Sequence, residues 1–268
     1  GELLSNSLLA RLHFKHVITI SQSMVSLFRG LNPDCKISDL QHGIIYNNKK
    51  DYVQNNRVES NLLDNDVNLL LNGEAFKGLL IANDDSTFFK KNISVIGGHV
   101  SKSEPIHTQF NNNILVTLQF THDHTQLDNE CLYKYLNQFI SATDEDINFY
   151  LKQHPRYNNE IDISSVLSLK NVHSAPEDIS DCFQLCSLHL TAYSTSTFEA
   201  ALCGIPTIFV NPLKKYDFFR LDFNYPLQHF IDDFKDASLY SSSSKIVREW
   251  ASNYYSSYNE QQFLNAIR

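Results

Sequence analysis

Short apolar runs alternate with stretches of helical periodicity along most of this chain. The alternation occurs twice, and residues 101–113, which show no periodicity, separate the two series. Strands that alternate with helices predict parallel sheets whose strands are joined by crossover helices. We therefore expect an α/β fold with two Rossmann-like lobes, residues 1–104 and residues 105–268.

The first series is the shorter of the two. Residues 46–72 are rich in asparagine and predict a mobile surface loop. With only about 100 residues before the linker, we expect the first lobe to be short or incomplete, or the chain to be cut from a longer protein. The expected strands are 16–20, 35–41, 78–83 and 92–98, with a helix at 21–31.

The second series is the more regular. Its helix at 126–142 has apolar residues at helical spacing. We expect residues 240–245, YSSSSK, to form a surface loop and the chain after them to be helical. The expected strands are 113–120, 147–153, 187–192 and 206–210, and the further helices are 176–186 and 196–203.

Composition narrows the function classes. Of 268 residues, 42% are hydrophobic and 19% are charged, which is ordinary for a soluble globular protein. The net charge of −8 argues against nucleic acid as a partner. No apolar run is as long as a membrane span, and the N-terminus lacks the pattern of a signal peptide, so we expect a cytoplasmic protein. Five cysteines without paired Cys-x-x-Cys motifs predict reduced thiols rather than zinc ligands.

Residues 194–206 concentrate polar side chains between two expected strands. In one interpretation they only cap a helix. Ser196 and Glu199 fit the S-x-x-E capping box, Gly204 suits a left-handed stop, and Pro206 prevents continuation of the helix.

The same cluster has a functional interpretation. A helix start presents unpaired N–H groups and a partial positive charge, both of which favour a phosphate. Four successive hydroxyl residues, Ser194 to Thr197 (Ser194, Thr195, Ser196, Thr197), add donors there, and Glu199 could accept hydrogen bonds from ribose hydroxyls. In open α/β sheets such turns lie at the carboxyl ends of strands, where ligands bind.

Two segments resemble a known fold family. AYSTSTFEAALCGIPTIFVNP, residues 192–212, resembles the donor-binding segment of GT-B-fold glycosyltransferases. FYLKQHPR places His154 and Pro155 at a strand end and resembles the His-Pro motif of bacterial sialyltransferases, Kdo transferases and related capsule enzymes. The resemblance implies that His154, Pro155 and Arg156 bind the donor together with the Ser/Thr cluster. A structural turn is the alternative for a His-Pro dipeptide.

A third segment, ISDLQHGIIY, resembles the Gln-His-Gly segment of surface-polysaccharide transferases. Gly43 permits a tight turn, and imidazole suits a general base near neutral pH, so we expect His42 to deprotonate the acceptor. Asp84 and Asp85, after an expected strand, are the second candidates for the base, although they also suit a plain helix start. Sialyltransferases with His-Pro motifs usually carry an acidic pair before a glycine in the first lobe, and this pair is absent here. The resemblance therefore does not imply a sialic-acid donor.

The loop THDHT after the strand at 113–120 is the last candidate. The resemblance implies that Thr121, His122 and Asp123 approach the donor phosphates or the acceptor. A metal site is the alternative, but two histidines spaced i, i+2 without further ligands are a weak metal signal. GT-B enzymes generally need no metal held by Asp-x-Asp, so we expect no metal and no cofactor.

Together these features predict a glycosyltransferase of bacterial surface polysaccharide, capsule or lipooligosaccharide synthesis. The first lobe would bind a glycan or lipid-linked acceptor and the second a nucleotide sugar. The resemblance implies a cytoplasmic protein with peripheral association at the inner face of the membrane. The alternatives are a sugar-nucleotide epimerase or polyol-phosphate transferase on the same fold, or a non-catalytic glycan- or nucleotide-binding module. The donor sugar, its base and the stereochemistry stay open.

Overall fold

The computed structural model describes residues 13–98 and 105–268. The chain divides into two compact units. Unit 1 comprises Gly1–Val100 and Ser252–Arg268, and unit 2 comprises Ser101–Ala251. The expected boundary at residues 104 and 105 falls beside a segment, 99–104, that lies outside the described residues.

The C-terminal residues depart from the expected division, which assigned them to the second lobe. They return to unit 1, where the backbone N–H of Gly98 donates to the carbonyl of Ser256 at 2.9 Å and that of Asn259 donates to Ile96 at 2.8 Å. Apolar periodicity predicts that a terminal helix forms, but it does not say which sheet the helix covers.

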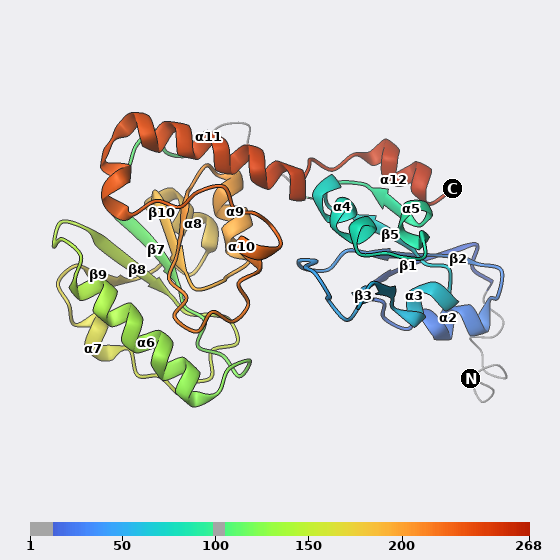
Figure 1. Cartoon of the computed structure of the whole chain (residues 1–268), viewed down its shortest axis with the longest axis horizontal. Coiled ribbons are helices and arrows are strands. Elements are labelled where there is room, and N and C mark those ends of the chain that lie inside the picture. Colours follow the sequence, from blue (N-terminus) through green and yellow to red (C-terminus); the bar gives the residue numbers. More distant parts are fainter. Residues whose placement is uncertain (1–12, 99–104) are drawn as a thin grey trace. The chain divides into compact units, whose positions relative to one another are not determined.

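Unit 1 contains a four-stranded sheet of order β1-β2-β5-β6, in which every pair is parallel. A small antiparallel hairpin, β3-β4, follows β2 (Figure 1). The strands are β1 His16–Ile20, β2 Lys36–Leu40, β3 Val53–Gln54, β4 Arg57–Val58, β5 Asn68–Leu71 and β6 Ile93–Val95. The helices are α2 Val25–Leu31, α3 Ser60–Asp64, α4 Glu74–Ala82, α5 Phe88–Lys91 and α12 Glu260–Ala266.

Two expectations for unit 1 are wrong. Residues 78–83 form the end of helix α4 rather than a strand, because Phe76 and Leu80, one turn apart, are both fully buried. Residues 46–72 are not a plain loop, since they contain β3, β4, α3 and β5. The buried apolar side chains of β5 fill the middle of the sheet, although polar residues flank them in the sequence.

Unit 2 contains a five-stranded parallel sheet of order β11-β10-β7-β8-β9. Its strands are β7 Asn113–Thr117, β8 Asn148–Lys152, β9 Val172–Ser174, β10 Leu188–Thr191 and β11 Thr207–Phe209. Its helices are α6 Gln126–Ser141, α7 Ser164–Leu167, α8 Ile179–Leu185, α9 Ser196–Leu202, α10 Phe218–Leu221, the 3-10 helix η2 Ile231–Lys235 and α11 Ala237–Tyr254, whose last three residues belong to unit 1.

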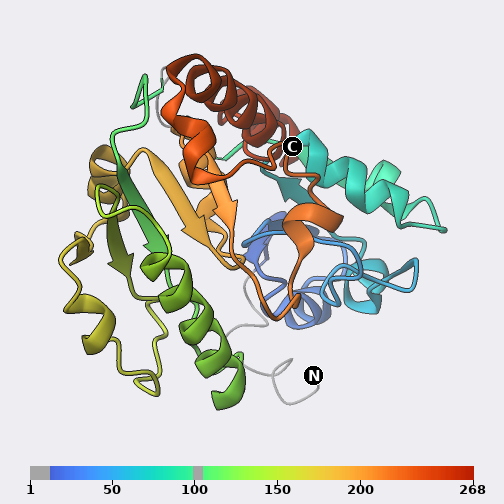
Figure 2. The same ribbon diagram turned by 60° about the vertical axis from the view of Figure 1, so that its left-hand side comes forward.

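Alternation along β7 separates the two faces of the unit 2 sheet. Ile114 and Val116 pack in one core with Leu132 of α6, whereas Leu115 packs in a second core with Cys182 of α8 and Ala200 of α9. Helix α6 lies along its face of the sheet in both views (Figure 1 and Figure 2). The expected α/β fold with two parallel sheets is confirmed.

The expected loop at residues 240–245 is also wrong, because these residues lie inside α11. Tyr240, Ser243, Ser244 and Val247 are buried, at spacings of three and four residues that place them on one helix face. Burial of this face holds a serine-rich run in a helix. Among the residues that the structure describes, no helix is both long and apolar enough to cross a membrane.

Candidate functional site

Three of the predicted site segments follow adjacent strands of the unit 2 sheet. Residues 121–123 follow β7, residues 154–156 follow β8 on one side of it, and residues 194–197 follow β10 on the other side. Since all these strands are parallel, the three loops start at the same edge of the sheet, which is the edge where α/β proteins bind ligands.

The loop after β8 orients His154. The backbone N–H of Arg156 donates to Nδ1 of His154 at 3.0 Å, so a neutral ring carries its proton on Nε2. Desolvation and the nearby Arg156 lower the pKa of the half-buried His154, while Asp123 opposes them. The loop therefore presents a neutral imidazole with an N–H donor.

The loop after β7 contacts the loop after β8. Asp123 forms an ion pair with Arg156, with Oδ2 and Nη2 2.7 Å apart. The backbone N–H of Asp123 donates to the Thr121 hydroxyl at 3.2 Å, and Thr121 is buried. Thr121 thus shapes the turn, whereas Asp123 and the exposed His122 lie at the surface.

The same loop contacts the loop after β10 through an aromatic cluster that the sequence reasoning missed. Nε2 of the buried His124 is hydrogen-bonded to the phenol of Tyr193. Tyr216 completes the cluster, with its ring centroid 5.8 Å from that of His124 and 5.0 Å from that of Tyr193. Tyr216 has φ of 55°, a left-handed conformation that costs free energy and is often found at functional sites.

The Ser/Thr turn does not form the predicted capping box. Helix α9 begins at Ser196, and its N-cap residue Thr195 makes no side-chain cap. Instead Ser194 Oγ lies 2.8 Å from Ser196 Oγ and accepts the Ser196 backbone N–H at 3.3 Å. Gly204, with φ of 77°, ends the helix as predicted. The turn therefore leaves the Thr195 hydroxyl exposed and couples Ser194 to Ser196.

The remaining two residues of the cluster differ in exposure. Thr197 is fully buried and its hydroxyl is enclosed by protein, so that hydroxyl lies away from the exposed part of the turn. Glu199 is exposed as a residue, but desolvation of its carboxyl group raises its pKa. Of the two, only Glu199 is open to a ligand at this edge.

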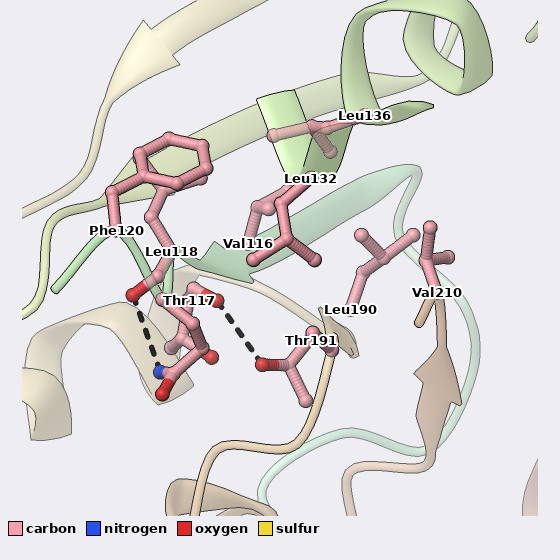
Figure 3. Close-up of a pocket in the computed structure, with 11 residues that line it drawn as sticks. Val116, Thr117, Leu118, Phe120, Leu132, Leu136, Leu190, Thr191 and Val210 are labelled. Carbon is pink, nitrogen blue, oxygen red and sulfur yellow. Dashed lines mark hydrogen bonds between the residues drawn. The ribbon is translucent and has the colours of Figure 1, made fainter. Parts of the chain in front are cut away.

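A small hollow lies below this edge, between α6 and the ends of β7 and β10 (Figure 3). Its volume is about 30 Å³, and its lining is mostly aliphatic, with Val116, Leu132 and Leu190 among its residues. The Thr191 hydroxyl donates to the carbonyl of Thr117 at 3.1 Å beside it. This volume holds about one water molecule, so a nucleotide would have to lie over the open edge instead.

In unit 1, His42 follows β2 at the carboxyl edge of its own sheet. Its side chain is exposed, and Gly43 has φ of 67°, which confirms the expected tight turn. Beneath it lies Asp39, which is fully buried, together with Tyr52, whose phenol is hydrogen-bonded to the backbone of His42. Burial raises the pKa of Tyr52, and Asp39 raises it further.

Asp39 is the residue of this edge that sequence reasoning missed. Its Oδ1 accepts the Thr19 hydroxyl at 2.7 Å and the Gln22 backbone N–H at 2.7 Å. Its Oδ2 is buried and has no partner among the described residues. Desolvation raises the pKa of Asp39, whereas the bonds from Thr19 and Gln22 and the nearby His42 act to lower it.

The structure does not support the argument that selected Asp84 and Asp85. Both follow helix α4, not a strand. Asp84 accepts hydrogen bonds from the backbone of Ser86 at 2.7 Å and of Phe89 at 2.7 Å, so it caps α5. Desolvation acts to raise its pKa, but the hydrogen bonds from Ser86 and Phe89 lower it overall. Its carboxylate is therefore a helix cap, which is the structural alternative.

Metal binding has little support from the donor set. Among residues 13–98 and 105–268, no group of three or more histidine, cysteine, aspartate or glutamate side chains is placed to hold a metal ion. His124, the third residue of the weak metal pattern, uses Nε2 to bond Tyr193. Metal and cofactor independence stay predictions.

Comparison with known proteins gave matches in structure only. No known protein family and no curated protein sequence matches the chain. A variant of S. aureus TarM in complex with fondaparinux, alpha-GlcNAc-glycerol and UDP has a TM-score of 0.55 and 15% identity, over 94% of this chain and 55% of TarM. The fold is GT-B.

Two other similar structures are a complex with UDP and an epimerase. S. aureus MnaA with UDP has a TM-score of 0.50 and 13% identity, over 94% of this chain and 77% of MnaA. The UDP-GlcNAc 2-epimerase from Methanocaldococcus jannaschii has a TM-score of 0.51 and 14% identity, over 87% of this chain and 70% of the epimerase. The match to TarM, described above, covers 55% of that protein, so this chain spans about half the length of TarM. The narrower resemblance to sialyl- and Kdo-transferases stays a prediction.

Proposed function

We propose that the protein is a metal-independent GT-B glycosyltransferase that moves a sugar from a nucleotide-activated donor to a glycan acceptor in bacterial surface polysaccharide synthesis. One observation carries the proposal. The loops after β8 and β10 both contact the loop between them, through the Asp123–Arg156 ion pair and the hydrogen bond between His124 and Tyr193. The His-Pro segment and the Ser/Thr turn thereby border one edge of one sheet.

The groups at this edge suit a nucleotide phosphate. The Nε2–H of His154, the guanidinium of Arg156 and the hydroxyls of Ser194, Thr195 and Ser196 are all hydrogen-bond donors. Donors held in place before the reaction stabilise the negative charge that develops on a leaving nucleotide. The complexes of TarM and MnaA with UDP support a nucleotide ligand on this fold.

Glu199 and His42 complete the proposed reaction. Glu199, one turn into α9, accepts hydrogen bonds from the ribose hydroxyls. His42 of unit 1 removes the proton from the acceptor hydroxyl as that oxygen attacks the anomeric carbon and the nucleotide leaves. Pro155 fixes the β8 loop, while His122 and Asp123 contact the donor or the acceptor.

Calorimetric titration with CMP, UDP, GDP and CDP tests the donor site. We expect one nucleotide to bind, and His154→Ala and Ser194→Ala each to weaken it about tenfold, the size of one hydrogen bond to a charged group. His107→Ala is the matched control, because the His107 ring instead bonds the carbonyl of Phe183. No binding by the wild-type protein, or equal binding by all variants, would falsify the donor site.

An epimerase is the second candidate, favoured by the structural similarity to the UDP-GlcNAc 2-epimerase from Methanocaldococcus jannaschii. The two reactions separate when UDP-GlcNAc is incubated without acceptor. Formation of the C2 epimer without acceptor indicates an epimerase, whereas nucleotide release that depends on an added glycan indicates a transferase. Release that depends on a CDP-linked polyol indicates a polyol-phosphate transferase, and binding without any turnover indicates a non-catalytic module.

A further inference from the structure

His189 lies in the middle of the unit 2 sheet and is not among the residues that the sequence predicted for the site. It is the second residue of β10 and is fully buried. In register it is opposite Thr207 of β11 and Leu115 of β7. Because alternate residues share a face, Thr117 lies on the face of Leu115, which is the face that α9 covers.

Both ring nitrogens of His189 have hydroxyl partners. Nε2 lies 2.9 Å from the Thr117 hydroxyl and 3.4 Å from that of Ser196, and Nδ1 lies 3.0 Å from that of Thr207. Desolvation lowers the pKa of His189 to about 3, so the ring is neutral at neutral pH. A neutral imidazole has one N–H donor and one acceptor nitrogen, so the partners of each nitrogen decide where the proton lies.

The two ring nitrogens differ in their number of hydroxyl neighbours. Nδ1 has only the Thr207 hydroxyl beside it, whereas Nε2 lies between the hydroxyls of Thr117 and Ser196. One N–H can be shared between two oxygens, and one hydroxyl can donate to one nitrogen lone pair. This arrangement favours the ring proton on Nε2, with Thr207 donating to Nδ1.

We propose that His189 is a positioning residue of the nucleotide site: its Nε2–H, shared between Thr117 and Ser196, keeps the Ser196 hydroxyl proton free to be donated to the donor phosphate. With the opposite tautomer, Nε2 would accept a proton from one of these hydroxyls. Ser196 is half-buried and lies 2.8 Å from Ser194, so the buried ring acts on the exposed turn through one hydroxyl. This inference rests on the proposed function of the turn.

The tautomer is measurable without a ligand. Two-bond ¹H–¹⁵N couplings of the imidazole distinguish the protonated nitrogen, and loss of the signal in His189→Gln assigns it. We expect Nδ1 to be the unprotonated nitrogen. A protonated Nδ1 in the folded wild-type protein overturns the inference, whatever the variants do.

A double-mutant cycle tests the connection to the ligand. We expect His189→Leu to weaken binding of the nucleotide selected by titration about tenfold, and to have almost no further effect in a Ser196→Ala background. His189→Gln places an amide N–H near the Nε2 position, so it should restore most of the affinity. His107→Leu is the matched control, with a histidine in the same unit whose ring bonds a backbone carbonyl.

The outcomes separate this inference from the proposed function. If the wild-type protein binds none of CMP, UDP, GDP and CDP, the proposed function fails and the role of His189 in it fails as well. If a nucleotide binds but the two substitutions are additive, the inference alone is overturned. If His189→Leu does not fold, the same cycle with Thr207→Val, which removes the donor to Nδ1, gives the answer: an additive result contradicts the inference and a non-additive one supports it.

Discussion

Each unit buries one ionisable side chain in the middle of its parallel sheet, and the two differ in how they are satisfied. His189 of unit 2 has a hydroxyl partner at both ring nitrogens. Asp39 of unit 1 has two donors at Oδ1 but none, among the described residues, at Oδ2. A fully paired buried group organises its neighbours, whereas a buried carboxylate oxygen without a partner stays available for a proton or a nearby charge.

His189 and Asp39 each lie below a different proposed site, and their hydrogen-bond pairing suits the role of that site. His189 acts from below on the Ser/Thr turn, where binding requires fixed donors. Asp39 lies below His42, the proposed base, where chemistry requires a proton to move. We therefore expect substitutions in unit 1 to change turnover and substitutions in unit 2 to change nucleotide affinity.

The largest expected effect tests that separation. His42→Ala should lower turnover about 100-fold or more, since it removes the general base, and should leave nucleotide affinity unchanged. Steady-state kinetics and calorimetric titration measure the two quantities, with His13→Ala, an exposed histidine of unit 1, as the control. The comparison breaks if His42→Ala retains full turnover or if Asp85→Asn, rather than His42→Ala, abolishes it.

The next effect concerns stability. Asp39→Ala leaves the Thr19 hydroxyl and the Gln22 N–H without their acceptor, so we expect the free energy of unfolding to fall by about 1–3 kcal/mol. Asp39→Asn keeps an oxygen at Oδ1 and should lose less. Urea unfolding measures both, and Asp34→Ala, at an exposed position, should change stability by less than about 0.5 kcal/mol. Equal losses for Asp39→Ala and Asp34→Ala would contradict the network around Asp39.

A further prediction concerns the pH dependence of the free energy of unfolding. The folded pKa of His189, about 3, lies below its ordinary value of 6.5, so between these values the unfolded chain binds the extra proton. Stability due to His189 is therefore lost as pH falls through this window, by up to about 1.4 kcal/mol per pH unit. The folded pKa of Asp39 is raised above 3.8, so its contribution is present at low pH and is lost as pH rises from 3.8 through the raised value.

Urea unfolding across this pH range measures both slopes. We compare the free energy of unfolding at each pH between the wild-type protein and a variant. The wild-type value minus that of His189→Gln should rise with pH. The wild-type free energy of unfolding minus that of Asp39→Asn should fall with pH. Two slopes of the same sign would show that one of the two groups is not buried as the structure has it.

The sequence predicts the fold well where burial and local pattern agree. Strand β7 has a continuous apolar run, Ile114 to Val116, with a polar residue on each side, which is the pattern of a strand buried on both faces. Prediction from the sequence fails where a short apolar run is compatible with both a strand and a helix. Residues 78–83 suit a strand or a helix, and the burial of Phe76 together with Leu80 decides for the helix.

The order of the motifs also predicts which loops share an edge. Parallel strands bring the loops after β7, β8 and β10 to one side, whatever their side chains are. The partners across that edge are not predictable in the same way. Tyr193 is 69 residues from His124, and no local spacing indicates their contact.

The sequence by itself determined the alternation of strands and helices, and with it the parallel sheets, the GT-B type of fold and the edge where the polar loops gather. Local pattern suffices for this because hydrophobic periodicity and turn residues act over a few positions. Only the tertiary structure decided that Asp39 and His189 are buried, what each is bonded to, and that the C-terminal helix returns to unit 1. Burial and pairing depend on residues far apart in the chain, so they exist only once the sheets have formed.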